Sequence, residues 1–218
     1  MPLCVRASAE EMQDLHAVTH GTRETPKIAL TFDACPAHDM KVDWAVLETL
    51  IATQTKATLF LSGKWMVRFP EAVQILAAFP QFEFGQHSYS HPHMTQLTEQ
   101  KMVEELRTTQ EIIKNLTGRT AAFFRPPFGE YNDLLLQTVR KLGMTTIEYE
   151  VISGDPSPTV GKTSLVKRVT ALAQNGSIII MHVNGRGWHT AEALPEIIQN
   201  LKSKGFEFVT VSELLSSK

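Results

Sequence analysis

The sequence predicts an α/β fold in which a parallel, barrel-like sheet is wrapped by helices. Short β-rich runs alternate with segments of helical period along almost the whole chain, which is the pattern of this class. The 218 residues, 43% of them hydrophobic, are enough for one large domain with a sizeable core. We expect residues 26–218 to form this domain and the less regular residues 1–25 to form an N-terminal extension.

The expected strands and helices follow from residue type, periodicity and punctuation. Seven β-rich runs predict strands at 27–32, 57–61, 82–85, 121–125, 145–152, 177–181 and 207–210. Between them, helices are expected at 42–51, 71–79, 98–116, 132–142, 164–174 and 191–204. Thr98, three residues before Lys101, is a predicted N-cap. Glycines follow four of the expected helix ends, where a left-handed residue is often needed, at Gly118, Gly143, Gly176 and Gly205.

Charge and hydropathy exclude two classes of partner. The 21 basic and 23 acidic residues nearly cancel and form no long run of one sign, so we expect no nucleic-acid partner. No apolar run approaches the roughly 20 residues of a membrane helix, so we expect no transmembrane segment. Residues 1–6 lack the apolar core of a signal peptide, although a removed signal would leave the same sequence. Cys4 and Cys35 neither demand nor exclude a disulfide, and we expect each to be a buried free thiol.

A pair of histidines marks a candidate metal site. His87 and His91 lie four residues apart, directly after the expected strand 82–85. A turn that leaves a strand end can aim two imidazoles at one point, and neutral imidazole is a common ligand of zinc-like metals. Two ligands do not complete a site, so other residues must supply the rest.

Further polar residues fall where other expected strands end. Asp33 follows the strand 27–32, Arg125 ends the strand 121–125, Asp155 comes shortly after 145–152, and His182 follows 177–181. Because the carboxyl ends of parallel strands share one rim in such folds, we expect these side chains to line one cleft with the histidine pair.

This arrangement resembles the polysaccharide deacetylase family, also called the NodB homology domain or carbohydrate esterase family 4. The matching pieces are 31–33, 87–92, 125–129, Asp155 and 180–182, within a similarity that runs from about Lys27 to Leu215. The resemblance implies a distorted (β/α) barrel of about seven parallel strands. It also implies a metal-dependent N-deacetylase.

The resemblance assigns a role to each residue of the metal side of the site. His87 and His91 match the metal-binding histidines, and Asp33 matches the general base. Arg125 matches the arginine that pairs with this base and keeps it ionised. The cofactor implied is a divalent metal ion, with Zn²⁺ as the expected one.

The acid side of the site is assigned in the same way. His182 matches the general acid that protonates the departing amine, and Asp155 matches the acid that holds this imidazole. The backbone N–H of Phe128 matches a donor to the oxyanion. Trp188, in a glycine-rich loop near His182, is a candidate for stacking on a sugar ring.

One position departs from the family pattern. Ala34 stands where the family has a second aspartate, its third protein ligand to the metal. Three alternatives remain: Asp33 itself serves as a ligand, with water filling other positions; His38 or Asp39 folds back as the replacement; or metal binding is lost. We favour retained activity with Asp33 as a ligand, because the other functional positions keep their chemistry.

The expected function is hydrolysis of an N-acetyl group on an amino sugar of a chitin-like or peptidoglycan-like glycan. The expected partner is therefore an N-acylated glycan or amino sugar. One alternative is hydrolysis of another C–N amide, in an N-formyl sugar or a small amide. The other is a metal-free, non-catalytic glycan-binding homologue. The family resemblance favours a periplasmic or secreted location.

Overall fold

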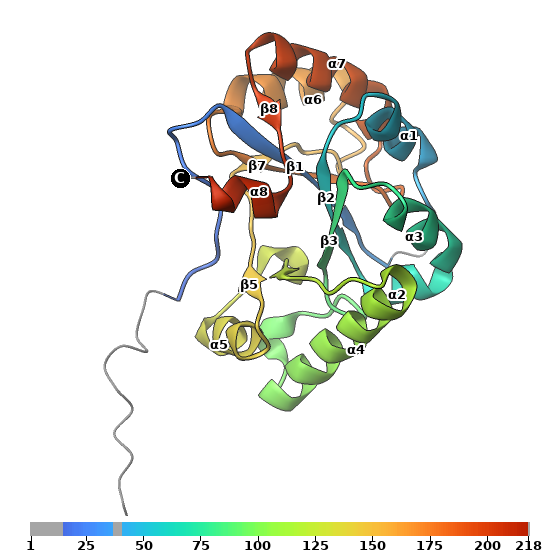
Figure 1. Ribbon diagram of the computed structural model, residues 1–218, viewed down its shortest axis with the longest axis vertical. Coiled ribbons are helices and arrows are strands. Elements are labelled where there is room, and N and C mark those ends of the chain that lie inside the picture. Colours follow the sequence, from blue (N-terminus) through green and yellow to red (C-terminus); the bar gives the residue numbers. More distant parts are fainter. Residues whose placement is uncertain (1–14, 37–40, 218) are drawn as a thin grey trace, which may run out of the picture.

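The computed structural model describes residues 15–36 and 41–217, and it confirms the predicted α/β fold (Figure 1). Within these residues, one sheet of parallel strands has the order β5-β4-β3-β2-β1-β7-β6, and β8 pairs with β1. The strands are β1 (Lys27–Ala34), β2 (Ala57–Leu61), β3 (Phe82–Gln86), β4 (Phe123–Phe124), β5 (Thr145–Thr146), β6 (Val151–Ile152), β7 (Ile178–His182) and β8 (Glu207–Phe208). The sheet curls into an incomplete barrel.

Helices surround the outside of this sheet (Figure 1). They are α1 (Trp44–Ala52), α2 (Gly63–Arg68), α3 (Pro70–Ala77), α4 (Glu99–Thr117), α5 (Asp133–Lys141), α6 (Lys162–Leu172), α7 (Thr190–Ser203) and α8 (Val211–Ser216). The predicted cap of α4 is confirmed, because the Thr98 side chain accepts a hydrogen bond from the N–H of Lys101, and Gly118 ends this helix at a φ of 70°. The sequence did not predict the short helices α2 and α8.

The single strand expected at 145–152 is wrong, because the structure divides it into β5 and β6. Between them, the backbone pairs with the N-terminal extension: Ile147 forms a bridge with Val18, and the N–H of Glu148 donates to the carbonyl of Val18. The segment then crosses to β7, where the N–H of Glu150 donates to Ile178. The chain thus spans the opening between the two edge strands, with part of the extension packed beside it.

Three apolar clusters stabilise the described part of the chain, the smallest of them between α4, α5 and β4. The largest lies between the sheet and its helices and includes Leu30, Leu59 and Leu194. The second contains Phe60, Ile178 and other strand residues together with Leu214 of α8. The backbone N–H groups of Val211 and Ser212, at the N-terminus of α8, donate hydrogen bonds to the side chains of Thr58 and Glu83 on the strands. Because α8 also contributes to this second cluster, it closes the amino end of the barrel. The opposite, carboxyl end is left for the site.

No helix of the described ranges is long and apolar enough to cross a membrane. Cys35 is a free, buried thiol, while Cys4 lies outside the described residues. His38 and Asp39, the two proposed replacements for a metal ligand, also lie outside them.

Candidate metal and catalytic site

The residues predicted for catalysis and metal binding converge at the carboxyl ends of the strands. Asp33 on β1 and His182 on β7 are Cα partners in the sheet register. His87 follows β3, and Arg125 follows β4. A cleft of about 190 Å³ opens there, and its lining includes Asp33, Cys35, His87, His91, Phe128, Asp155, His182 and Arg186. Arg125 lies behind this lining, fully buried.

Arg125 fixes the orientation and charge of Asp33. Its Nη1 donates to Oδ1 of Asp33 and to Oγ1 of Thr31, both at 2.8 Å, and its Nη2 donates to the carbonyl of Glu148 at 3.2 Å. Burial raises the pKa of Asp33, but the charges of Arg125, His87 and His182 outweigh this effect and lower the pKa below its ordinary value. Asp33 is therefore ionised at neutral pH and suited to accept a proton.

Asp155 fixes the second reactive group, His182. Its Oδ1 lies 2.9 Å from Nδ1 of His182, and its Oδ2 accepts hydrogen bonds from the backbone N–H of His182 and from Oγ1 of Thr190, both at 2.7 Å. Burial lowers the pKa of His182, but hydrogen bonds to Asp155 and Cys35 and the charges of Asp155 and Asp33 raise it to about 10. The imidazole is therefore protonated at neutral pH and able to act as an acid.

The turn that carries the histidine pair is held by its backbone. Ser88 and His91 both have left-handed φ values, 59° and 58°. The carboxylate of Glu105, on α4, accepts hydrogen bonds from the N–H groups of Tyr89 and Ser90 at 2.9 and 2.8 Å and from Oγ of Ser90 at 2.7 Å. These charge-assisted hydrogen bonds stabilise a turn that non-glycine residues seldom adopt.

Gly63, at the start of α2, lets the chain approach this turn. A Cβ at this position would lie 2.3 Å from the ring of Tyr89, and the Gly63 N–H donates to the carbonyl of Ser88. On the other side, Nδ1 of His87 lies 2.7 Å from the carbonyl of Arg125, so Nδ1 is the donor and Nε2 is the free ligand atom. The imidazoles of His87 and His91 have ring centroids 4.8 Å apart.

A group of three metal-ligand atoms lies in the cleft. One donor atom from each of Cys35, His87 and His91 lies within 4.8 Å of the others, the only such group of His, Cys, Asp and Glu side chains in the described part of the chain. Thiolate and imidazole are the usual ligands of zinc, so this donor set fits the metal that the sequence predicted. Asp33 is not in this group, although its Oδ2 lies 3.7 Å from Nε2 of His87.

The thiol of Cys35 is surrounded by imidazoles. Burial raises its pKa, but the charge of His87 and hydrogen bonds with His182, His87 and His91 lower it well below the ordinary value of a thiol. The buried free thiol expected at Cys35 is confirmed, but the sequence did not indicate it as a ligand. Its signal was its spacing, because a residue two places after Asp33 lies on the same face of a strand.

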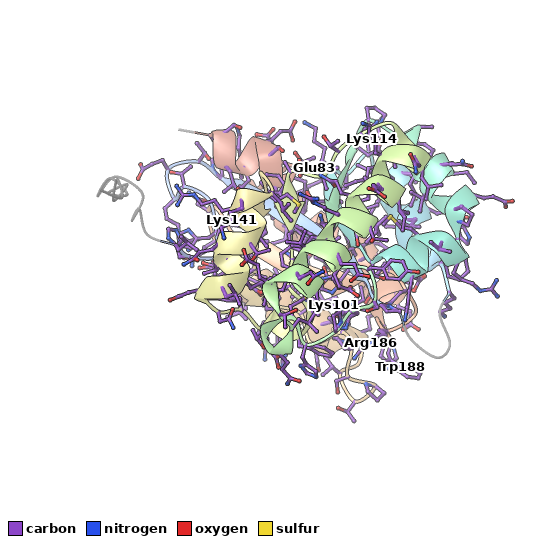
Figure 2. The ribbon with its side chains drawn as sticks, turned by 90° about the horizontal axis from the view of Figure 1, so that it is seen from below. Glu83, Lys101, Lys114, Lys141, Arg186 and Trp188 are labelled. Carbon is purple, nitrogen blue, oxygen red and sulfur yellow. The ribbon has the colours of Figure 1, made fainter. Side chains whose placement is uncertain are left out.

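Aromatic residues line or flank the cleft. Phe128 has a left-handed φ of 61°, and its ring, 52% exposed, stacks on His93 at a centroid distance of 4.2 Å and contacts the ring of His91 edge-on. Trp188, 61% exposed, lies on the loop after β7, and its backbone N–H donates to the carbonyl of Asp155. Figure 2 shows Trp188 beside Arg186, on the side of the molecule away from Glu83.

Two glutamates close to the site were not predicted from the sequence. Glu105, on α4, accepts hydrogen bonds from the backbone of the histidine turn. In the sequence it cannot be distinguished from the other glutamates of this helix. Glu148 is buried beside Arg125. Burial and the negative charge of Asp33 raise its pKa, the charges of Arg125 and His87 lower it, and the result is a pKa of about 7. Only the packed structure shows that these two glutamates lie next to the site.

Known proteins resemble this chain in sequence and in fold. Residues 20–147 match the family model described as polysaccharide deacetylase. The chain is 32% identical over 192 residues to the peptidoglycan-N-acetylglucosamine deacetylase PgdA of Listeria monocytogenes, which covers 88% of this chain and 39% of that protein. The chain therefore spans well under half the length of this relative.

Two solved structures have the same fold. The Bc1960 peptidoglycan N-acetylglucosamine deacetylase superposes with a TM-score of 0.86 at 28% identity, covering 93% of this chain and 94% of that one. BA3943 of Bacillus anthracis, described as a CE4 family pseudoenzyme, superposes with a TM-score of 0.84 at 27% identity, covering 95% and 72%. Because the family model matches more than half of this chain, the chain belongs to the polysaccharide deacetylase family.

Proposed function

We propose that this protein is a metal-dependent hydrolase that removes the N-acetyl group from an amino sugar of a glycan, of the peptidoglycan or chitin type. The observation that carries the proposal is the pairing of an ionised Asp33 with a protonated His182 at one sheet register, beside the imidazoles of His87 and His91. The names of the peptidoglycan deacetylases that the chain resembles support the substrate class.

Amide hydrolysis needs a nucleophile, charge relief on the carbonyl oxygen and a proton for the leaving nitrogen. A divalent ion, with zinc the one that suits the donor set, would make a water acidic and polarise the scissile carbonyl when held by His87 and His91. Asp33 takes a proton from the attacking water, and Arg125 keeps its carboxylate aimed into the cleft. The backbone N–H of Phe128 is the proposed donor to the oxygen that becomes negative.

His182 then gives its proton to the leaving amine. Its Nδ1 is engaged by Asp155, so Nε2 is the atom that can deliver the proton. An acid and base of this kind together contribute typically about 10²–10⁴-fold to rate. The exposed ring of Phe128 lines the cleft, and Trp188 lies next to it in the loop that contains Arg186 of the lining; both are proposed to stack on sugar rings adjacent to the acetylated one.

We further propose that this site is a variant of the family arrangement, in which Ala34 stands in place of an aspartate ligand. The similarity to a Bacillus anthracis protein described as a pseudoenzyme favours the alternative in which this chain is not catalytic. The ionised base, the protonated acid and the intact pair of orienting residues support an active site instead.

Acetate release from chitin oligomers and from peptidoglycan tests the proposal. The zinc-supplemented protein is expected to release acetate, and Asp33→Asn and His182→Ala are each expected to reduce the rate by at least about 100-fold. Asp133→Asn, an exposed carboxylate in the first turn of α5, is the matched control and should leave the rate unchanged. Equal rates in Asp33→Asn and wild type would contradict the proposal. Hydrolysis of small amides without acetate release from glycans would contradict the glycan assignment.

A further inference from the structure

The position of Cys35 carries an inference about the metal centre, which rests on the proposed metal-dependent function. Asp33 and Cys35 are two residues apart at the end of β1, so they share the face that looks into the cleft. Ala34 lies between them and belongs to the apolar core that contains Val46 and Leu47. The side chain of residue 34 therefore packs in the core, and the side chain of residue 35 lines the cleft.

The backbone around Cys35 is fixed on both sides. The carbonyl of Ala34 accepts hydrogen bonds from the N–H and Oγ of Ser62, at 3.1 and 2.8 Å. The carbonyl of Cys35 accepts a hydrogen bond from Nδ2 of Asn184, at 2.6 Å. Both Ser62 and Asn184 are buried, and they follow β2 and β7 directly or closely. The thiol is therefore held in place by two neighbouring segments of the barrel.

The ligand atoms of the site lie as a metal centre requires. Cys35 and His87 are 3% and 2% exposed, and with His91 they form the group whose donor atoms lie within 4.8 Å of one another. A catalytic zinc site has three protein ligands and an open position for water, and thiolate and imidazole are both ligand types that such sites use.

The other candidate in the described cleft is already engaged. Oδ1 of Asp33 accepts the hydrogen bond from Arg125, an arrangement that suits a base better than a ligand. The methyl group of Ala34 has no ligand atom. We infer that the thiolate of Cys35 is the third protein ligand of the metal, completing a centre with His87 and His91. A thiolate ligand favours zinc or cobalt over the oxygen-preferring magnesium, calcium and manganese.

Cobalt binding tests this inference without reference to activity. Metal-free protein is titrated with Co²⁺ under anaerobic conditions while the near-ultraviolet absorption is recorded. Wild type is expected to show a sulfur-to-cobalt charge-transfer band that saturates at one equivalent. Cys35→Ser should lose the band and bind zinc more weakly than wild type by at least the roughly 100-fold that outer-shell changes reach.

A matched variant separates ligation from folding. Cys35→Asp keeps an anionic ligand without sulfur, so it should bind zinc more tightly than Cys35→Ser while showing no charge-transfer band. His87→Ala should lose both the band and the tight zinc binding. Circular dichroism of each metal-free variant checks that the fold is retained.

Two results would overturn the inference. One is cobalt binding by wild type without the band, together with equal zinc affinity in Cys35→Ser, which would assign the position to another residue. The other is an acetylated Cys35 trapped by acid quench during turnover without added metal, because Cys35 beside the pair His182–Asp155 would then be a nucleophile. A charge-transfer band in a protein that releases no acetate would support this inference and contradict the proposed function.

Discussion

Arg125 and Asp33 form a buried ion pair, in which Nη1 donates to Oδ1 at 2.8 Å and the two side chains are 1% and 4% exposed. The guanidinium also lies over the ring of Phe60, with 4.1 Å between its Cζ and the ring centroid. The pair holds the proposed base ionised, and each partner compensates the buried charge of the other.

Arg125→Ala is expected to destabilise the protein by about 3–5 kcal/mol, because it leaves the buried carboxylate of Asp33 without its partner. Urea unfolding monitored by circular dichroism measures this loss. Arg119→Ala is the control: that arginine donates to two backbone carbonyls at the surface, and its loss should cost about 1 kcal/mol. Equal losses for the two variants would contradict the role of the ion pair.

Glu105→Gln is expected to weaken zinc binding by about 10–100-fold, because the carboxylate that receives three hydrogen bonds from the histidine turn is lost. Competition with a chromogenic chelator measures the affinity. Glu104→Gln changes the neighbouring residue, whose carboxylate is exposed and pairs with Lys101, and it should bind zinc as wild type does. If both variants behave alike, the turn does not depend on Glu105.

Local sequence patterns predicted the regular elements well. The run 57–61 forms β2 with the predicted bounds, since a short, mostly apolar run of residues that suit a strand is visible in the sequence itself. The division of 145–152 was not predictable, because it depends on pairing with Val18, more than a hundred residues away.

The site shows the same distinction. Strand ends and the histidine pair indicated Asp33, His87 and His182, because parallel strands bring their carboxyl ends together. The placement of Cys35 among three imidazoles depends on where three separate loops meet. The support from Glu105 depends on how α4 packs, which no local pattern encodes.

Asp155→Asn is expected to lower kcat by at least about 100-fold, because His182 loses the negative partner that favours its protonated form. The acetate-release assay at saturating substrate measures kcat. Thr159→Val, on the same loop but in an exposed hydroxyl pair, should leave kcat unchanged. A wild-type kcat in Asp155→Asn would show that His182 does not act as the acid.

Glu148→Gln is expected to change how stability depends on pH. The pKa of Glu148 is raised to about 7, and its Oε1 has no hydrogen-bond partner within the described residues. From pH 4.5 to 7 the unfolded chain releases this proton while the folded protein retains it, so folding stability falls as pH rises. Glutamine does not titrate, and the variant avoids this loss.

Urea unfolding of the metal-free proteins at pH 5 and pH 8 measures this effect. Relative to wild type, Glu148→Gln should gain on the order of 2 kcal/mol between the two pH values. A difference between variant and wild type that is the same at both pH values would contradict the raised pKa of Glu148.

Trp188→Ala is expected to raise KM for a chitin oligomer by roughly 5-fold with little change in kcat, since the loss of one stacking contact costs about 1 kcal/mol. Steady-state kinetics with oligomers of increasing length measures both constants. Trp44→Ala removes a half-exposed tryptophan on α1 that lines a different hollow of the surface, with Arg68 and Ile75, and should leave KM unchanged. An unchanged KM in Trp188→Ala would contradict a contact between this ring and the substrate.

The most direct test is the dependence of acetate release on bound metal. Metal-free protein is titrated with zinc, and bound zinc and the initial rate of acetate release from a chitin oligomer are measured on the same samples. The rate is expected to rise in proportion to bound zinc and to level off at one equivalent, with His87→Ala inactive throughout. Acetate release by the metal-free protein at the full rate, or a rate that does not follow bound zinc, would contradict a metal-dependent deacetylase.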